Sequence, residues 1–370
     1  MPKFITYSFL FLFFTLIFSC GNSPKVDPNA MKFTDISQED MDWWNSLLPA
    51  WKKIFSEEVF IKKEITPAHL EELFKINRIT IAKTKLSNLD PLLRFKNLES
   101  IMCSQNNIDN VNALAGLPKL QRVTLNRNRI KSIGPLKHLK NLKVLILNHN
   151  QIESLEPLKD MKTLEQINIC NNRLTSLDGL DSLTSLQQLL ASNNQIDTLR
   201  QLRNLPNLIR LYIDNTKITN FDSLENLSNI IDLDIKGNRM TDFLELKKFT
   251  ALKTIDLSNT LIESLEPLKK MTSMERLICE NTPLTSLKGI EKMENLKQIY
   301  CDYTDITDLK PAKNLMNLSK IVCRNTKITD LEPLKDHQQI KVLARNSGLT
   351  KEYVEEFLKD RPKIRVDLSN

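Results

Sequence analysis

The chain has 370 residues, a length that normally suggests two or three globular domains. Its net charge of +7 comes from 52 basic and 45 acidic residues that are interspersed along the chain. Nucleic-acid binding needs a concentrated basic surface with stacking aromatic side chains. The sequence contains no run of that kind, so we expect no nucleic-acid partner.

The first residues have the pattern of an export signal. Lys3 precedes an apolar run from Phe9 to Phe18, and Ser19-Cys20-Gly21 follows. A short basic region, a short apolar region and a small residue before a cleavage point are typical of a secretory signal. We therefore expect a lipoprotein signal peptide over residues 1–19, a lipid on Cys20 and a polar tether over residues 20–36.

A cysteine directly after a small residue resembles a bacterial lipobox, although Phe18 is bulkier than the usual residue at its position. The implied location is the bacterial cell envelope, with the outer membrane favoured and attachment through lipidated Cys20. The alternative is an uncleaved membrane anchor.

Residues 37–68 are expected to form a helical N-terminal cap. Ser37 and Asp40 have the spacing of a capping box, Pro49 is expected to break the first helix, and Thr66 followed by Pro67 predicts the start of another. Apolar residues recur at helical spacing at Met41, Trp44, Leu48, Trp51 and Phe55. The two tryptophans are compatible with a ligand site, but we favour a role in covering the open end of the apolar core that follows.

A pattern with a period of 22 residues fills the chain from His69 to Glu332, in twelve copies without a gap. In the copy Pro135–Glu156, numbered as repeat positions 1 to 22, apolar residues occupy positions 2, 5, 8, 11, 13, 18 and 21, and Asn150 occupies position 16. A fixed period with this spacing of leucines is typical of a solenoid. Each repeat is expected to give one strand around positions 10–14, and neighbouring strands to align in a parallel concave sheet.

The repeat resembles the 22-residue leucine-rich-repeat class that is shared by bacterial internalin-type surface proteins and a eukaryotic phosphatase-regulating subunit. The resemblance covers residues 69–350, as twelve full repeats and a degenerate thirteenth. It implies an α/β solenoid shaped as a horseshoe or arc, with a parallel concave sheet. It also implies a binding scaffold rather than an enzyme, and it leaves the partner open.

Position 16 is expected to tie the buried backbone groups of each turn. Asparagine holds it in Asn106, Asn128, Asn150, Asn172, Asn194 and Asn238, and threonine in Thr84, Thr216, Thr260, Thr282, Thr304 and Thr326. We expect the exchange to alter the turn geometry slightly. Position 13 holds Cys103, Cys279, Cys301 and Cys323. A metal site or a disulfide is conceivable there, but we favour buried free thiols, with Cys170 at position 14 as a candidate for exposure.

The regular pattern ends after Pro333, although Ile340 and Leu343 are expected to keep the register. Residues 351–370 are expected to form a C-terminal cap, a helix capped by Thr350 and a last strand from Ile364 to Leu368. The sequence shows neither an immunoglobulin-like domain nor a wall-sorting signal after the cap, which differs from many internalins.

The concave face is the usual binding surface of a solenoid, and position 12 projects from it. Its apolar and aromatic residues suggest a protein-binding site, because exposed apolar patches mark partner sites and tyrosine is favoured at hot spots. The candidates are Tyr212, Asp234, Asp256, Ile278, Tyr300 and Val322, with Tyr303 at position 15 nearby. The alternative is lateral packing between neighbouring strands that hides these side chains.

Charged residues on the same face are expected to pair partly with one another. Arg210 with Asp232, Asp214 with Lys236, and Asp302 with Arg324 share repeat positions on adjacent strands. Asp234 and Asp256 stack like charges instead. Too few oxygen ligands surround them for calcium. A basic residue of a partner is one interpretation, and simple solvation of both carboxylates is the other.

Catalytic motifs are missing from the sequence, and its four histidines occupy unrelated repeat positions. We therefore expect a non-enzymatic monomer without a cofactor or metal, which binds an unidentified protein. The main hypothesis is a lipid-anchored envelope protein that acts in adhesion or host interaction. The alternative is a periplasm-facing scaffold or assembly factor. An intracellular protein of the phosphatase-regulator type is less compatible with the signal sequence.

Overall fold

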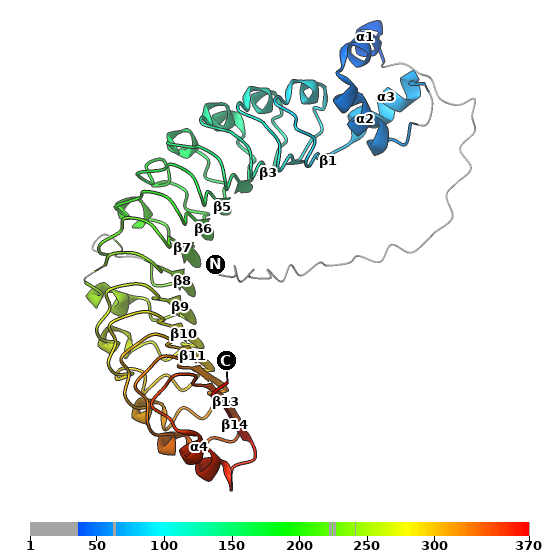
Figure 1. Cartoon of the computed structure of the whole chain (residues 1–370). Coiled ribbons are helices and arrows are strands. Elements are labelled where there is room, and N and C mark those ends of the chain that lie inside the picture. Colours follow the sequence, from blue (N-terminus) through cyan, green and yellow to red (C-terminus); the bar gives the residue numbers. More distant parts are fainter. Residues whose placement is uncertain (1–35, 62–63, 222–223, 225–226, 241, 370) are drawn as a thin grey trace.

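The structure is a computed structural model of the whole chain, and it describes residues 36–61, 64–221, 224, 227–240 and 242–369. The predicted signal peptide, Cys20 and nearly all of the tether lie outside the described residues. The described residues form an open arc whose inner side is one parallel sheet of 14 strands in sequence order (Figure 1). This confirms the predicted α/β solenoid.

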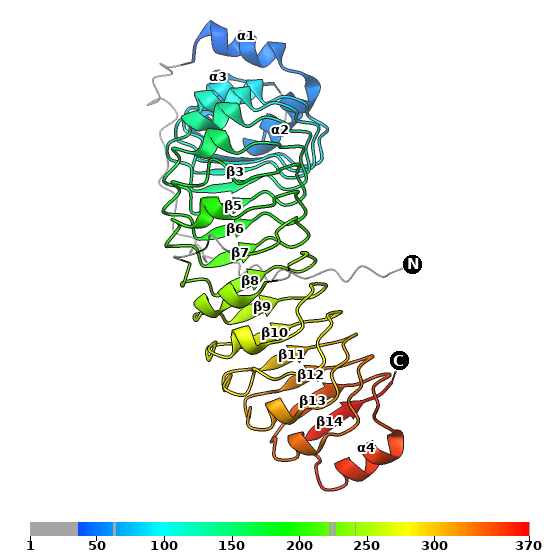
Figure 2. The ribbon, with the colours of Figure 1, turned by 90° about the vertical axis from the view of Figure 1, so that its left-hand side faces the viewer.

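Each repeat contributes a strand of three residues at positions 10–12. The strands are β1 Arg78–Thr80, β2 Ser100–Met102, β3 Arg122–Thr124, β4 Val144–Ile146, β5 Gln166–Asn168, β6 Gln188–Leu190, β7 Arg210–Tyr212, β8 Asp232–Asp234, β9 Thr254–Asp256, β10 Arg276–Ile278, β11 Gln298–Tyr300 and β12 Lys320–Val322. The middle residue of each strand is buried in the core, and the residues on either side face the concave surface. Figure 2 shows the strands stacked as rungs along the molecule.

The outer side of the arc carries short 3-10 helices in place of strands. They are η1 Asp90–Arg94, η2 Asn112–Gly116, η3 Gly134–His138, η4 Glu156–Leu158, η5 Arg200–Leu202, η6 Leu244–Lys248, η7 Glu266–Leu268, η8 Lys310–Ala312 and η9 Glu332–Leu334. A repeat of 22 residues leaves only a few residues for this side. Proline at repeat position 1 fits the first turn of such a helix, because its missing N–H has no partner there.

Asparagine at position 16 joins neighbouring repeats, as the sequence predicts. The Asn150 side chain donates from Nδ2 to the Leu147 carbonyl of its own repeat, at 2.9 Å, and to the Leu125 carbonyl of the preceding repeat, at 3.0 Å. Its Oδ1 accepts from the Ile130 amide at 3.0 Å. The Thr282 hydroxyl makes only the bond within its own repeat, to the Cys279 carbonyl at 2.8 Å, and Thr260, Thr304 and Thr326 do the same.

The backbone of the turn is nonetheless alike in both kinds of repeat. Position 15 has a left-handed φ of 56° at Asn171, before an asparagine, and of 52° at Asn281, before a threonine. The expected change in turn geometry is therefore wrong at this residue. What changes along the chain is the hydrogen bonding between repeats.

A second set of asparagines, at position 7, ties the flank of the arc and was missed from the sequence. The Asn141 amide donates to the Pro118 carbonyl of the preceding repeat at 3.0 Å, and Asn207, Asn229, Asn295 and Asn317 repeat this bond at 2.8 to 3.0 Å. Position 7 also holds lysine, serine and threonine, so its role is hidden in the sequence.

Three helices cover the first repeat, which confirms the helical N-terminal cap: α1 Gln38–Ser46, α2 Pro49–Glu58 and α3 Pro67–Lys75. Ser37 and Asp40 form the predicted capping box, and the chain breaks before Pro49. Trp51 is 2% exposed and stacks at 5.1 Å from Phe55, which packs in turn on Phe95 of the second repeat. The tryptophan stripe therefore serves as part of the core.

The other end of the arc is closed by β13 Ile340–Leu343, α4 Lys351–Leu358 and β14 Ile364–Asp367, which confirms the helix-plus-strand cap. The register of the thirteenth repeat differs from expectation. Val342 pairs with Ile321 and Leu343 with Val322, an offset of 21 residues. One residue is thus lost before the strand, and Leu343 takes an outward position. No helix in the described part of the chain is long and apolar enough to cross a membrane.

Candidate functional site

Three columns of side chains project from the concave face, at repeat positions 10, 12 and 14. The strands pair in strict register, so that each column places equivalent residues side by side; Tyr212 pairs with Asp234, and Asp234 with Asp256. Neighbouring strands lie about 4.8 Å apart, within reach of one another's side chains. The predicted site residues at position 12 are therefore neighbours over β7 to β12.

Asp234 and Asp256 are both half-buried in the middle of this column. Each carboxylate accepts a bond from a backbone amide two residues on, Lys236 at 3.1 Å and Ser258 at 2.9 Å. Burial, followed by the charges of Asp256 and Asp214, raises the pKa of Asp234 to about 8. This part of the concave face therefore has a negative potential that no ion pair of Asp234 within the described residues relieves.

Glu280 extends the acidic region to the next strand. Burial, followed by the charges of Asp302 and Asp256, raises its pKa above the ordinary value. It makes no salt bridge within the part of the chain that the structure describes. We refer to Asp234, Asp256 and Glu280 together as the acidic region.

Tyr212 borders the acidic region and is fixed by hydrogen bonds. Its hydroxyl donates to Asp232 at 2.7 Å, and Arg210 donates to the same carboxylate from Nε at 3.1 Å. The predicted Arg210–Asp232 pair is thus confirmed. Burial, followed by the Asp232 acceptor, raises the pKa of the Tyr212 hydroxyl. The ring is half-buried, so Tyr212 offers a rigid edge rather than a free side chain.

Tyr300 lies between two cations on the other side of the acidic region. The Arg276 guanidinium and the Lys320 ammonium each lie 4.9 Å from the centre of its ring. Its hydroxyl donates to Gln298 at 3.0 Å. Ile278 pairs with Tyr300 on the adjacent strand and is likewise half-buried. Arg276 and Lys320 were missed from the sequence, and reading position 10 as a column would have found them.

Val322 corrects the predicted column. Its side chain is 1% exposed, because neighbouring strands pack against it, so the expectation of an outward apolar residue is wrong there. Lateral packing, the alternative interpretation, holds for Val322. Tyr303 differs: it is 63% exposed at the turn after β11 and has a left-handed φ of 55°.

The other two predicted charge pairs have different outcomes. Arg324 donates from Nε to Asp302 at 2.8 Å, which confirms that pair. Asp214 and Lys236 form no ion pair in the described structure; the Asp214 carboxylate accepts from the Asn215 amide at 2.9 Å instead. The turn asparagine lies closer to Asp214 than the lysine does.

Cysteines at position 13 are buried free thiols. Cys279, Cys301 and Cys323 lie on adjacent repeats, and the Cys279 thiol donates to the Tyr300 carbonyl at 3.4 Å. Burial raises the pKa of Cys323 to about 12, so its thiol stays neutral and unreactive. Cys170 is half-buried rather than exposed, and burial raises its pKa to about 11. Among the described residues no cluster of three or more metal-ligating side chains occurs.

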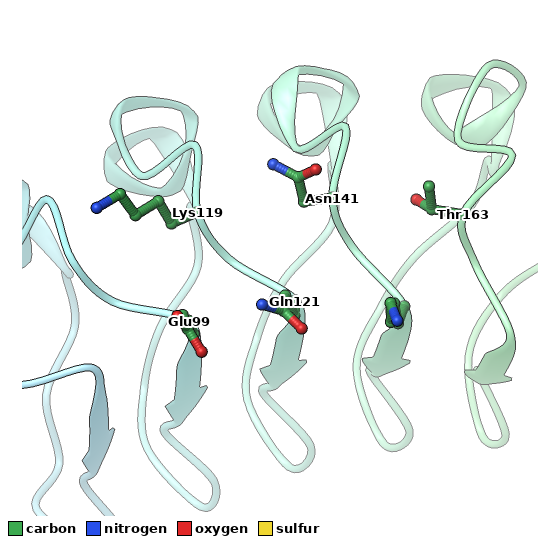
Figure 3. Close-up of a pocket in the computed structure, with 6 residues that line it drawn as sticks. Glu99, Lys119, Gln121, Asn141 and Thr163 are labelled. Atoms are coloured by element: carbon green, nitrogen blue, oxygen red, sulfur yellow. The ribbon is translucent and has the colours of Figure 1, made fainter.

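A shallow depression of about 430 Å³ lies on the flank of the arc, apart from the concave columns (Figure 3). Its lining is polar: Glu99, Lys119, Gln121, Asn141, Lys143 and Thr163. Asn141 and Thr163 already bond the carbonyls of the preceding repeat. The depression is therefore part of the flank's own hydrogen bonding, and the concave face remains the better candidate.

Comparison with known proteins supports the fold. Residues 118–160, 162–204 and 184–228 match a family model for leucine-rich repeats in two copies. No curated protein matches the chain. The structure is similar to that of an internalin, InlF, from Listeria monocytogenes, with a TM-score of 0.68 and 20% identity over 88% of this chain and 93% of that one.

Two further structures show the same architecture. A leucine-rich-repeat protein of Leptospira interrogans has a TM-score of 0.69 and 20% identity, over 85% of this chain and 98% of that one. The ectodomain of the Arabidopsis thaliana receptor kinase GASSHO1/SCHENGEN3, solved in complex with CASPARIAN STRIP INTEGRITY FACTOR 2, has a TM-score of 0.53 and 16% identity over 77% of this chain and 43% of that one. With the repeat, the register and these matches together, the chain is a leucine-rich-repeat protein with an internalin-like arc.

Proposed function

We propose that the chain is a non-enzymatic protein-binding protein whose partner contacts the concave face over β7–β11. The contact residues are Tyr212, Asp234, Asp256, Ile278 and Tyr300, with Tyr303 at the edge. Leucine-rich-repeat proteins are typically interaction scaffolds, and the plant ectodomain similar in fold has a bound protein ligand. An open row of half-buried polar, aromatic and apolar side chains suits a macromolecule better than a small molecule.

Tyr303 carries the proposal. Asn281 and Asn325 hold the same turn position in the flanking repeats, and asparagine tolerates a left-handed backbone far better than a bulky residue does. The tyrosine is also 63% exposed, so its ring gains little from the protein's own core. A strained, exposed aromatic residue indicates use by a partner.

For location, we propose a bacterial lipoprotein held at the envelope, at the outer membrane, by a lipid on Cys20, acting in adhesion or host interaction. The apolar run Phe9–Phe18 and the position of Cys20 support this proposal. Cys20→Ser is expected to abolish labelling by a palmitate analogue and to release the protein from the membrane fraction. Unchanged labelling would contradict lipidation. If protease added to intact cells leaves the protein uncut, the periplasm-facing scaffold role replaces the surface role.

The binding site is tested by capture of partners from envelope extract and from host matrix. The wild type is compared with Ile278→Lys/Tyr300→Ala, and the matched control is Ile146→Lys/Met102→Ala, at position 12 on β4 and β2. We expect the control to capture the same partner as the wild type and the β10–β11 variant to lose it. Equal capture by all three would place the site elsewhere.

A further inference from the structure

Four cations form a line on the C-terminal part of the concave face. Arg276, Lys320, Lys341 and Arg365 occupy one column, because the register pairs Arg276 with Gln298, Gln298 with Lys320, Lys320 with Lys341 and Lys341 with Arg365. We call these four residues the cationic row. With a strand spacing of about 4.8 Å, the row is about 19 Å long over β10–β14.

The cationic row has no counter-ions of its own. In the described structure none of the four side chains lies within 4.0 Å of a carboxylate, whereas Arg210 and Arg324 on the same face are paired at 3.1 and 2.7 Å. Lys341 and Arg365 are exposed. Such a line of unneutralised charge on an open face favours an anionic ligand.

Two members of the row are also held in place. The rings of the cation–π contacts converge on Tyr300, which fixes Arg276 and Lys320 on either side of it, each 4.9 Å from the ring centre. The Arg276 Nε atom is buried and has no hydrogen-bond partner within the described residues. The two charges are therefore positioned before any ligand arrives, which lowers the entropy cost of binding.

A uniform polyanion does not fit the surface next to the row. The acidic region, Asp234, Asp256 and Glu280, begins on β8 and reaches the turn after β10. A nucleic acid or a sulfated glycan that followed the sheet beyond the row would meet these carboxylates within one or two strand spacings. A polypeptide can instead carry opposite charges at its two ends and satisfy both regions.

We propose that the contact segment of the partner is a dipolar polypeptide, with acidic side chains on the cationic row and basic side chains on Asp234 and Asp256. This inference rests on the proposed function, because it names the partner of the same concave face. The middle of the acidic pair and the middle of Lys320 and Lys341 lie about four strands apart, or about 19 Å. An extended peptide covers that span with about six residues.

The test uses fluorescence anisotropy of labelled peptides with the full chain. The probes are a peptide with two lysines, a Gly/Ser spacer of about six residues and three glutamates, the same peptide in reversed order, a glutamate-only peptide and a lysine-only peptide. Heparin is the polyanion competitor. We expect one dipolar peptide to bind at least about tenfold more tightly than either single-sign peptide, and its affinity to fall as salt rises.

The variant Lys320→Glu/Lys341→Glu is expected to weaken the dipolar peptide by about tenfold or more. Arg122→Glu, at the same repeat position on β3 and equally exposed, is the matched control and should have little effect. Because charge reversal can disturb folding, Lys341→Gln/Arg365→Gln is measured too and should weaken binding to a smaller extent, with circular dichroism unchanged.

Equal binding of the dipolar and glutamate-only peptides would overturn the inference, as would heparin binding through Lys320 and Lys341 at similar affinity. The outcome for the proposed function is separate. If the captured partner is lost with Ile278→Lys/Tyr300→Ala but kept, without salt dependence, by Lys320→Glu/Lys341→Glu, the concave site stands and the dipolar partner is wrong. If both variants keep the partner, the concave site itself is wrong.

Discussion

At repeat position 15 the backbone turns through a left-handed conformation in every described repeat from Lys83 to Asn346, with φ between 52° and 71°. Asparagine and glycine adopt it at low cost, whereas a bulky side chain does not. The residues at this position therefore report where the sequence departs from the locally favoured choice. Tyr303 is the only aromatic residue among them.

Replacing Tyr303 with asparagine should separate stability from binding. We expect Tyr303→Asn to stabilise the fold by about 0.5–1 kcal/mol, because it relieves backbone strain that costs about 1–3 kcal/mol at such sites. Capture of the partner should weaken in the same variant. Urea denaturation and the capture assay measure the two effects. A loss of stability would mean that the ring supports the fold, contrary to its proposed role.

The position-16 ladder predicts unequal costs along the chain. Asn150→Ala leaves the Ile130 amide without its side-chain acceptor and removes two donated bonds, so we expect a cost of about 1–3 kcal/mol. Thr282→Val removes one bond, to the Cys279 carbonyl, and should cost about 1 kcal/mol. Urea denaturation of both variants provides the comparison, with Thr282→Ser as a control that keeps the hydroxyl. Equal costs would contradict a ladder that couples repeats.

At the scale of single elements, β8 and β9 carry an ionisable group whose state depends on the fold. An unfolded aspartate has a pKa of about 3.9, and the folded Asp234 has a pKa of about 8. Between these values the folded state binds more protons than the unfolded state. Its stability therefore falls as the pH rises through this window and levels off above it.

Asp234→Asn should remove this pH dependence. We expect little difference from the wild type near pH 4 and a gain of at least about 1 kcal/mol near pH 9, because the amide mimics the protonated carboxyl. Thermal denaturation across the pH range measures the difference. Asp305→Asn, at an exposed carboxylate, is the control. A gain that does not grow with pH would mean that the charge is not the cause.

The N-terminal helices should behave as a cover whose loss frays the first repeats. Trp51→Ala is expected to cost about 3–5 kcal/mol, because it empties a buried aromatic stack against Phe55. Leu48→Ala, at a side chain that is 64% exposed, should change stability by less than about 0.5 kcal/mol. Hydrogen exchange should show faster opening of β1 and β2 in Trp51→Ala. Uniform exchange along the chain would contradict a local role.

For the whole molecule, the change from asparagine to threonine at position 16 divides the solenoid into two halves with different coupling between repeats. In a linear array each repeat contacts only its neighbours, so local differences are not averaged out. The buried thiols report on both halves, since Cys103 lies in the asparagine part and Cys279, Cys301 and Cys323 in the threonine part.

We expect the thiol of Cys301 to become reactive at a lower urea concentration than that of Cys103, because fewer side-chain bonds join its repeats. Single-cysteine variants, each treated with a thiol reagent across a urea series, measure this order. Both thiols should be unreactive in the native protein, since burial raises the pKa of each. Identical urea dependence at the two sites would show that the arc unfolds as one unit.

The fold could be predicted from the sequence because a repeat multiplies a weak local signal. Twelve copies fix which positions are buried, and the burial of Leu145, Leu147 and their equivalents follows directly. Irregular regions were less predictable. The register of β13 shifts by one residue, and the flank asparagines at position 7 alternate with other residues that obscure the pattern.

The sequence by itself therefore determined the architecture of this protein: its repeat, its caps and the columns of its concave face. Tertiary structure alone decided how each outward side chain is used. Val322 is hidden by its neighbours, Tyr212 is bonded to Asp232, and Tyr300 is held between two cations. The physical reason is that periodicity fixes the direction of a side chain, whereas its exposure and partners depend on contacts across strands that lie 22 residues apart.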